Sequence, residues 1–323
     1  MVYGGQSIDE MGNVWMQVVP RDAQDLDTLR DDYRQKSLRR STESYERLVA
    51  AMPNLAPIRL TLGSSYVHLG RLREGIEQLT EAVRLDDADP VAHYNLGSAL
   101  SSAGDIERAR RHLARAIELK PDYAEAHNNL GAIARADGRA DDAVAHFTRA
   151  IRADPSFAFA HNNLGSMLRS RGRIDEAIEY YRRAVGASPD YADARYNLGL
   201  ALQTRGRTRE AIGELERVER EHPDHADALN MLAWILATSR DAALRQPARA
   251  VALAERAAAL AAADASTIDT LATSYAANGQ FERAVEAGER ALGLASGRAL
   301  KGLAAEIEAR IALFRKKQPF IEK

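Results

Sequence analysis

Four asparagines recur at intervals of 34 residues, each directly before a Leu-Gly pair: Asn95, Asn129, Asn163 and Asn197. A side-chain amide carries one acceptor oxygen and two donor hydrogens, which complement the N–H and C=O of a peptide group. One asparagine can therefore bond both backbone groups of an extended chain, and a row of them could hold a peptide with little regard for its sequence. We predict that these four residues bind a peptide.

Side chains around this row extend the candidate site. The residue before each asparagine is tyrosine or a second asparagine, and an arginine follows six residues after Asn129 and Asn163. These flanking candidates are Tyr94, Asn128, Asn162, Tyr196, Arg135 and Arg169. Each guanidinium could donate two parallel hydrogen bonds to an acidic side chain or a terminal carboxylate. Two alternatives stay open, since the asparagines could bond within their own helix pair and the arginines could simply be solvated.

Three histidines recur with the same interval, but their spacing does not suit a metal ion. His93, His127 and His161 lie one repeat apart instead of four residues apart on one helix, and no carboxylate recurs beside them. We expect these rings to pack between helices. Cysteine is absent, and no hydrolase, kinase or nucleotide-binding motif occurs. The sequence therefore predicts no catalytic residue, no metal and no cofactor.

The interval of 34 residues belongs to a longer pattern that must position these side chains. Repeats begin at residues 56, 90, 124, 158, 192 and 226, and we number positions 1 to 34 within each. Position 7 is leucine and position 8 is glycine or alanine; in most repeats position 15 is glycine, position 24 is bulky and position 32 is proline. Small residues let two helices approach closely, glycine ends the first helix, and proline ends the second. Each repeat is therefore predicted to be a helix, a turn and a second helix.

The leucine, glycine, alanine, aromatic and proline positions resemble those of the tetratricopeptide repeat family over about residues 56–298. The resemblance implies an all-α fold, a right-handed superhelical solenoid of helix-turn-helix repeats whose first helices line the concave face. Positions 2, 5, 9 and 12 form one stripe there, bordered by positions 6 and 13, and we call this surface the first-helix face. The resemblance also implies a scaffold without catalysis that binds a protein or peptide partner on this face. The asparagine row is similar to the asparagine ladder of the O-linked N-acetylglucosamine transferases.

The repeat also divides the chain into segments. We expect a β-like extended arm over 1–20, a capping helix pair over 21–55, five regular repeats over 56–225, a sixth repeat over 226–264, a seventh over 265–298, and a capping helix with a tail over 299–323. The sixth repeat carries five extra residues between Thr238 and Pro247. Trp234, at position 9 of the sixth repeat, is expected in the core and not as a binding anchor.

The first 20 residues depart from the helical pattern. Residues 14–19 are predicted as a β-strand that ends before Pro20. The preceding Ser-x-Asp-Glu-Met motif and this strand resemble the last strand of the copper type II, ascorbate-dependent monooxygenases, in which the methionine at the place of Met11 binds copper. The histidine ligands of that copper would lie upstream. The resemblance implies an alternative function, in which the chain is the C-terminal docking or regulatory part of a longer copper-dependent redox protein.

Composition bears on the remaining classes of partner. The formal net charge of -2 creates no field that attracts nucleic acid or an anionic membrane, so neither is an expected partner. No apolar run reaches the roughly 18 residues that a membrane span needs. Asp9 and Glu10 stand where a signal peptide carries basic residues. We expect a soluble protein, cytoplasmic by default and extracytoplasmic if a monooxygenase-like upstream domain exists, and we leave the oligomeric state open.

Overall fold

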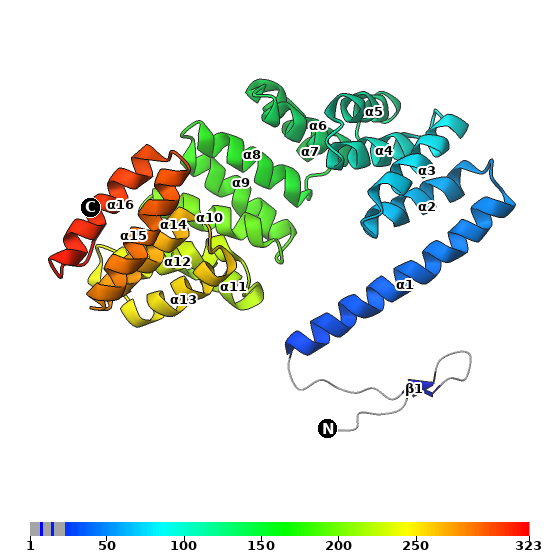
Figure 1. Cartoon of the computed structure of the whole chain (residues 1–323). Coiled ribbons are helices and arrows are strands. Elements are labelled where there is room, and N and C mark those ends of the chain that lie inside the picture. Colours follow the sequence, from blue (N-terminus) through cyan, green and yellow to red (C-terminus); the bar gives the residue numbers. More distant parts are fainter. Residues whose placement is uncertain (1–6, 9–13, 16–22, 323) are drawn as a thin grey trace. The chain divides into compact units, whose positions relative to one another are not determined.

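The computed structural model describes residues 7–8, 14–15 and 23–322, with side chains from residue 35 onward. The chain divides into two compact units, Met1–Asp137 and Gly138–Lys323. From residue 23 to residue 322 the regular secondary structure is helical throughout, and the helices follow one another in repeated pairs (Figure 1). The predicted all-α fold of helical repeats is therefore confirmed.

The first unit contains six helices in its described residues. They are α1 (Ala23–Ala51), α2 (Ala56–His68), α3 (Leu72–Leu85), α4 (Pro90–Ser102), α5 (Ile106–Leu119) and α6 (Ala124–Ala136). Helix α2 packs against α3 and α4 against α5, and each pair also contacts the next helix along the chain. A buried cluster that includes Leu79, Leu96, Leu113 and Leu130 fills the space between these helices.

The second unit continues the same pattern. Its elements are α7 (Ala140–Ala153), α8 (Ala158–Ser170), α9 (Ile174–Ala187), α10 (Ala192–Thr204), α11 (Thr208–Glu221), α12 (Ala226–Thr238), the 3-10 helix η1 (Ala242–Leu244), α13 (Pro247–Leu260), α14 (Ala265–Ala277), α15 (Phe281–Gly297) and α16 (Lys301–Arg315). The bulky residues at position 24, Phe147, Tyr181 and Leu215, are completely buried. The five extra residues of the sixth repeat lie around η1, between α12 and α13.

The glycines of the repeat act as the pattern predicts. Gly104 has a φ of 82°; its N–H donates to the Ser101 carbonyl at 3.1 Å, and the next N–H donates to the Leu100 carbonyl at 2.9 Å. This left-handed turn satisfies the last carbonyls of α4 and directs the chain into α5. Gly97, at position 8, permits a close approach, because a Cβ added there would lie 2.8 Å from Leu113 Cγ.

The N-terminal cap differs from its prediction. One continuous helix, α1, spans residues 23–51 in place of the expected capping pair over 21–55. Neither glycine nor proline occurs within α1, so nothing in the sequence ends a first helix there. The end of α1 still acts as the second helix of a repeat. Glu46 accepts a hydrogen bond from the Tyr66 hydroxyl at 2.8 Å, as Glu255 of α13 does from Tyr275 at 2.8 Å.

The N-terminal arm is described only in part. Two short strands, β1 (Ser7–Ile8) and β2 (Val14–Trp15), pair antiparallel. Met11 and the rest of the predicted 14–19 strand lie outside the described residues. The β-like arm and the copper-type resemblance therefore stay predictions, as does the right-handed superhelix, which concerns both units together.

Candidate functional site

The position-6 asparagines lie on the first helix of each pair, as the repeat predicts. Asn95 and Asn129 belong to α4 and α6 of the first unit, and Asn163 and Asn197 belong to α8 and α10 of the second. Each of these side chains is partly exposed, whereas the leucine that follows it is buried. Each asparagine therefore borders the first-helix face of its own unit.

In the first unit these asparagines bond back to the preceding repeat. Asn95 Nδ2 donates to Ser64 Oγ at 3.0 Å. Asn129 hydrogen-bonds the hydroxyl of Tyr94, which lies at position 5 of the repeat before it. Burial raises the pKa of Tyr94, the nearby Glu125 carboxylate raises it further, and the bond with Asn129 opposes both effects. The row is thus oriented by contacts between repeats.

The second unit shows the same relation between positions 5 and 6. Asn197 Nδ2 donates to Asn162 Oδ1 at 3.0 Å, and Asn162 Nδ2 donates to the Tyr191 hydroxyl at 3.2 Å. Asn162 is only 7 % exposed. Its oxygen accepts across the repeat boundary and its nitrogen donates within its own repeat, so Asn162 orients Asn197 instead of extending the exposed row. Asn128, its counterpart on α6 in the first unit, is partly exposed.

The predicted tyrosines contact the end of their own repeat. The ring of Tyr94 lies 4.9 Å from that of Tyr123, and the ring of Tyr196 lies 5.5 Å from that of His225. Both partners occupy position 34, directly before the next first helix. Each tyrosine is partly exposed. Such a pair leaves each tyrosine partly accessible, while its ring contact with position 34 helps to hold the loop.

Phe159 is a surface residue that the sequence reasoning did not name. It occupies position 2 of α8, is 53 % exposed, and its ring lies 4.8 Å from that of Tyr191. Val91, at the same position of α4 in the first unit, is 43 % exposed. Position 2 belongs to the predicted stripe, so a search along that stripe for large apolar residues would have found both.

The two predicted arginines fall in different units. Arg135 is exposed near the end of α6 in the first unit. Arg169, on α8 in the second, is partly exposed, and its Nε atom is buried without a hydrogen-bond partner among the described residues. The pKa of Tyr196 is raised by burial and by Asp227, while the charge of Arg169 lowers it. Arg169 and Tyr196 therefore share one electrostatic environment.

A cleft of about 310 Å³ continues the first-helix face of the second unit past the end of the asparagine row. Its lining includes Tyr196, Asp227 and Trp234. Its lining also includes a buried ion pair, in which Arg310 Nη2 of α16 lies 2.8 Å from Asp269 Oδ2 of α14. Burial raises the pKa of the Asp269 carboxyl, and Arg310 opposes that rise. Trp234 is partly exposed here, which corrects the expectation that it belongs to the core.

The histidines at position 4 pack between helices, as predicted, and each also contacts a loop carbonyl. In each case the ring Nε2 contacts the backbone carbonyl oxygen of the residue six positions earlier in the sequence. The distances are 3.3 Å from His93 to Asp87, 3.0 Å from His127 to Pro121 and 2.8 Å from His161 to Pro155. Arg195 takes the same place in the next repeat and donates to the Pro189 carbonyl at 2.7 Å. A polar residue at position 4 therefore fixes the loop between repeats.

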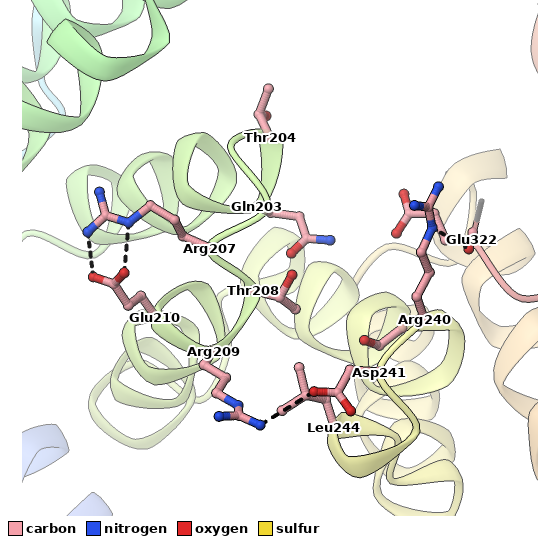
Figure 2. Close-up of a pocket in the computed structure, with 12 residues that line it drawn as sticks. Gln203, Thr204, Arg207, Thr208, Arg209, Glu210, Arg240, Asp241, Leu244 and Glu322 are labelled. Atoms are coloured by element: carbon pink, nitrogen blue, oxygen red, sulfur yellow. Dashed lines mark hydrogen bonds and ion pairs between the residues drawn. The ribbon is translucent and has the colours of Figure 1, made fainter.

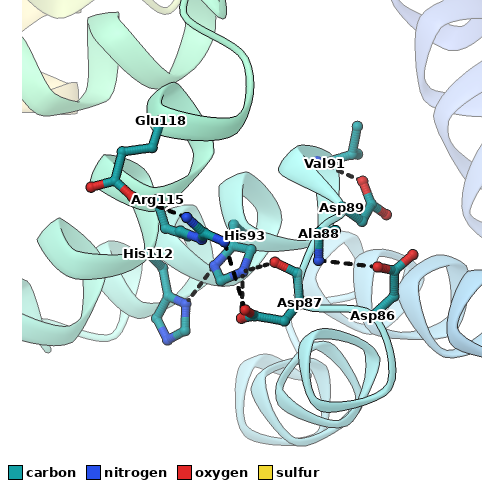
Figure 3. Close-up of polar contacts among 9 residues, drawn as sticks. All are labelled: Asp86, Asp87, Ala88, Asp89, Val91, His93, His112, Arg115 and Glu118. Carbon is teal, nitrogen blue, oxygen red and sulfur yellow. Dashed lines mark hydrogen bonds and ion pairs between the residues drawn. The ribbon is translucent and has the colours of Figure 1, made fainter.

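Figure 3 shows the contacts of the first of these histidines. His93 Nδ1 lies 3.1 Å from Nδ1 of His112, and Arg115 Nη2 lies 3.8 Å from Asp87 Oδ2. Burial lowers the pKa of His112, and the neighbouring His93 lowers it further. In the part of the chain that the structure describes, no three histidine or acidic side chains gather as metal ligands.

A second pocket, of about 700 Å³, lies at the turns of the second unit (Figure 2). Four of its charged side chains form two ion pairs: Arg207 Nη2 lies 2.7 Å from Glu210 Oε2, and Arg209 Nη2 lies 3.4 Å from Asp241 Oδ2. Glu322 of the C-terminal tail also lines it. This pocket lies off the asparagine row, and its main feature is the returning tail.

Comparison with family models identifies the repeat. Two models of the tetratricopeptide repeat match, the first over residues 60–101, 94–156 and 133–192 and the second over residues 168–235. Together they span more than half of the 323 residues. Comparison with curated proteins gives no match.

Solved structures that match with a TM-score above 0.5 share the fold. The APC/C hetero-tetramer Cut9-Hcn1 matches with a TM-score of 0.64 and 16% identity over 73% of this chain and 45% of that one. The pilF protein of Pseudomonas aeruginosa matches with a TM-score of 0.57 and 16% identity over 66% of this chain and 94% of that one. A MamA protein is 30% identical over 50% of this chain and 90% of its own, with a TM-score of 0.42. Among the described residues, no helix has the length and apolar composition of a membrane span.

Proposed function

Because the chain belongs to the tetratricopeptide repeat family, we propose that it is an interaction scaffold that binds peptide segments of partner proteins on its first-helix face. This role needs no catalysis. The main support is the state of two position-6 asparagines, one in each unit. Asn95 and Asn197 each use one amide N–H to bond the preceding repeat, and among the described residues the amide oxygen has no partner.

Such an asparagine is preorganised to bind a peptide. The bond to Ser64 or to Asn162 fixes the amide in one orientation, which lowers the conformational entropy lost when a ligand binds. The second N–H and the oxygen match the C=O and N–H of a peptide group. We therefore assign the backbone contacts to Asn95 and Asn129 in the first unit and to Asn163 and Asn197 in the second.

Neighbouring side chains would hold the side chains of the ligand. Tyr94 in the first unit, and Phe159 and Tyr196 in the second, offer aromatic surface beside the row. Arg135 and Arg169 would each receive a carboxylate of the ligand in their own unit. This arrangement favours an extended peptide that carries apolar and acidic residues, and Asn128 adds a polar contact in the first unit.

A peptide display library tests this proposal. Peptides selected on the full chain are labelled, and their affinities are measured by fluorescence anisotropy for the wild type, Asn95→Ala and Asn197→Ala. Each lost asparagine contact should weaken the peptides bound by its own unit by roughly 10-fold, the equivalent of one or two hydrogen bonds. The matched controls are Asn54→Ala and Asn278→Ala, which change exposed asparagines off the row. Affinities that stay at wild-type level in both row variants would refute the role of the row.

A further inference from the structure

The last residues of the chain fold back onto the first-helix face of the second unit. Helix α16 ends in a left-handed turn, in which Lys317 has a φ of 55° and the Gln318 N–H donates to the Leu313 carbonyl at 3.0 Å. Pro319 follows, so the helix cannot continue. The turn sends residues 318–322 away from α16 and back to α12, which lies more than 80 residues earlier in the sequence.

An aromatic anchor and two backbone bonds hold this segment. The ring of Phe320 lies 5.8 Å from that of Trp234, and the Arg310 guanidinium lies 5.4 Å from the Trp234 ring and 5.5 Å from the Phe320 ring. The Glu322 N–H donates to the Thr238 carbonyl at 2.9 Å. The Glu322 carbonyl accepts from Arg240 Nε at 3.3 Å (Figure 2). Both backbone groups of one residue are thus bonded by the end of α12 and the loop after it.

These contacts resemble those that a protein makes with a bound peptide. A side chain fills an aromatic site, and the backbone is held two residues further on. The contacted Trp234 occupies position 9 of the first-helix face. The Glu322 carboxylate makes no ion pair among the described residues, so the contacts do not select an acidic residue at that place.

We propose that the surface formed by Trp234, Thr238 and Arg240 is a peptide site that the tail occupies in cis. Its ligand in trans is a peptide with an aromatic residue two places before the residue whose backbone is bonded. This inference rests on the proposed role of the first-helix face. A tethered tail has an effective concentration in roughly the millimolar range, so it excludes a partner present at micromolar concentration until the tail is displaced.

The test uses a labelled peptide with the sequence Gln-Pro-Phe-Ile-Glu-Lys and fluorescence anisotropy. The full-length Phe320→Ala variant and a chain that ends at Gln318 should both bind this peptide at least about 10-fold more tightly than the wild type, because their site is vacated. A labelled peptide with alanine in place of phenylalanine should not bind. Glu322→Gln is the matched control and should behave like the wild type. Thermal melting establishes that each variant is folded. If the shortened chain is unfolded, the full-length Phe320→Ala variant still tests the inference.

Failure to detect the labelled peptide on folded Phe320→Ala would overturn the inference and reduce the tail to a structural cap. The outcome is independent of the asparagine row. If library peptides still bind through Asn197 while the tail peptide does not, only this inference falls. If the tail peptide binds while Asn197→Ala leaves library binding unchanged, the row falls and this site stands.

Discussion

Asn197 Nδ2 donates to Asn162 Oδ1 across a repeat boundary at 3.0 Å. The same relation, from position 6 of one repeat to position 5 of the repeat before it, joins Asn129 to Tyr94 in the first unit. Adjacent residues on one helix therefore have different roles. Position 5 supports the repeat interface, and that interface orients the amide at position 6.

Replacing Asn162 should destabilise the chain and also disturb Asn197. In Asn162→Ala the Tyr191 hydroxyl and the Asn197 amide each lose their bond to a buried side chain, which should cost about 1–2 kcal/mol of unfolding free energy. Urea unfolding followed by circular dichroism measures this loss. Asn278→Ala, at an exposed helix end, should stay within about 0.5 kcal/mol of the wild type. Equal stability of the two variants would show that Asn162 has no structural role.

Gly97 should tolerate no side chain. A Cβ there would lie 2.8 Å from Leu113 Cγ and 3.1 Å from the Ala109 carbonyl oxygen, so α4 and α5 must move apart. We expect Gly97→Ala to lose about 1–3 kcal/mol.

Gly213 is the matched control for that substitution, because it lies inside α11 and a Cβ added there would meet no described atom within 4 Å. Gly213→Ala should gain up to about 1 kcal/mol, since alanine is the better helix former. Thermal melting of the two variants checks the prediction, and a shift of the same sign in both would contradict it.

The buried Arg195 should matter more than an exposed arginine. Arg195 is 4 % exposed, donates to the Pro189 carbonyl and lies 2.8 Å from Glu214 Oε2. Arg195→Met keeps much of the apolar stem but leaves a carbonyl and a carboxylate without their donor, at a cost of about 1–3 kcal/mol. Arg207→Met removes only an exposed ion pair with Glu210 and should cost less than about 1 kcal/mol. Chemical denaturation of both variants decides, and a larger loss in Arg207→Met would count against the loop-fixing role.

His112 should make the first unit sensitive to acid. Its folded-state pKa is lowered from 6.5 by burial, by His93 and by the cations Arg108 and Arg111, while Asp87 opposes them. The folded state therefore binds fewer protons than the unfolded chain. The stability that this histidine contributes is present above pH 6.5 and is lost as the pH falls through its folded pKa.

The melting temperature of the wild type should accordingly fall between pH 7.5 and pH 5, and His112→Gln should show a smaller fall. Melting curves at fixed ionic strength measure both. The same pH slope in the two proteins would show that this histidine is not responsible.

Much of the fold could be predicted from the sequence because the repeat is local. Leucine, glycine and proline at fixed positions determine where helices begin, end and pack, and the φ of 82° at Gly104 is the conformation that glycine permits. The prediction for α1 is wrong because it extends the repeat into a segment that contains no residue to end a helix. The polar residue at position 4 could have been explained from the sequence. It always follows position 32 of the preceding repeat by six residues, and that is the residue whose carbonyl it contacts.

The site was less predictable, because its contacts join residues far apart in the chain. Asn162 and Asn163 are adjacent asparagines that the sequence does not distinguish. The structure shows that Asn162 is the buried one and that it bonds the Tyr191 hydroxyl. The partly exposed Trp234 contacts Phe320, and no periodicity relates these two residues. Repeat patterns report what recurs, whereas these contacts occur once.

The most direct test of the proposed scaffold measures whether Asn197 bonds the backbone of a ligand. A library-selected peptide that needs Asn197 is N-methylated at each residue in turn, and dissociation constants are measured for the wild type and for Asn197→Ala. At one position, methylation should weaken binding to the wild type by roughly 10-fold and have no further effect on Asn197→Ala, because both changes remove the same hydrogen bond. Losses that multiply independently at every position would contradict a backbone contact by Asn197.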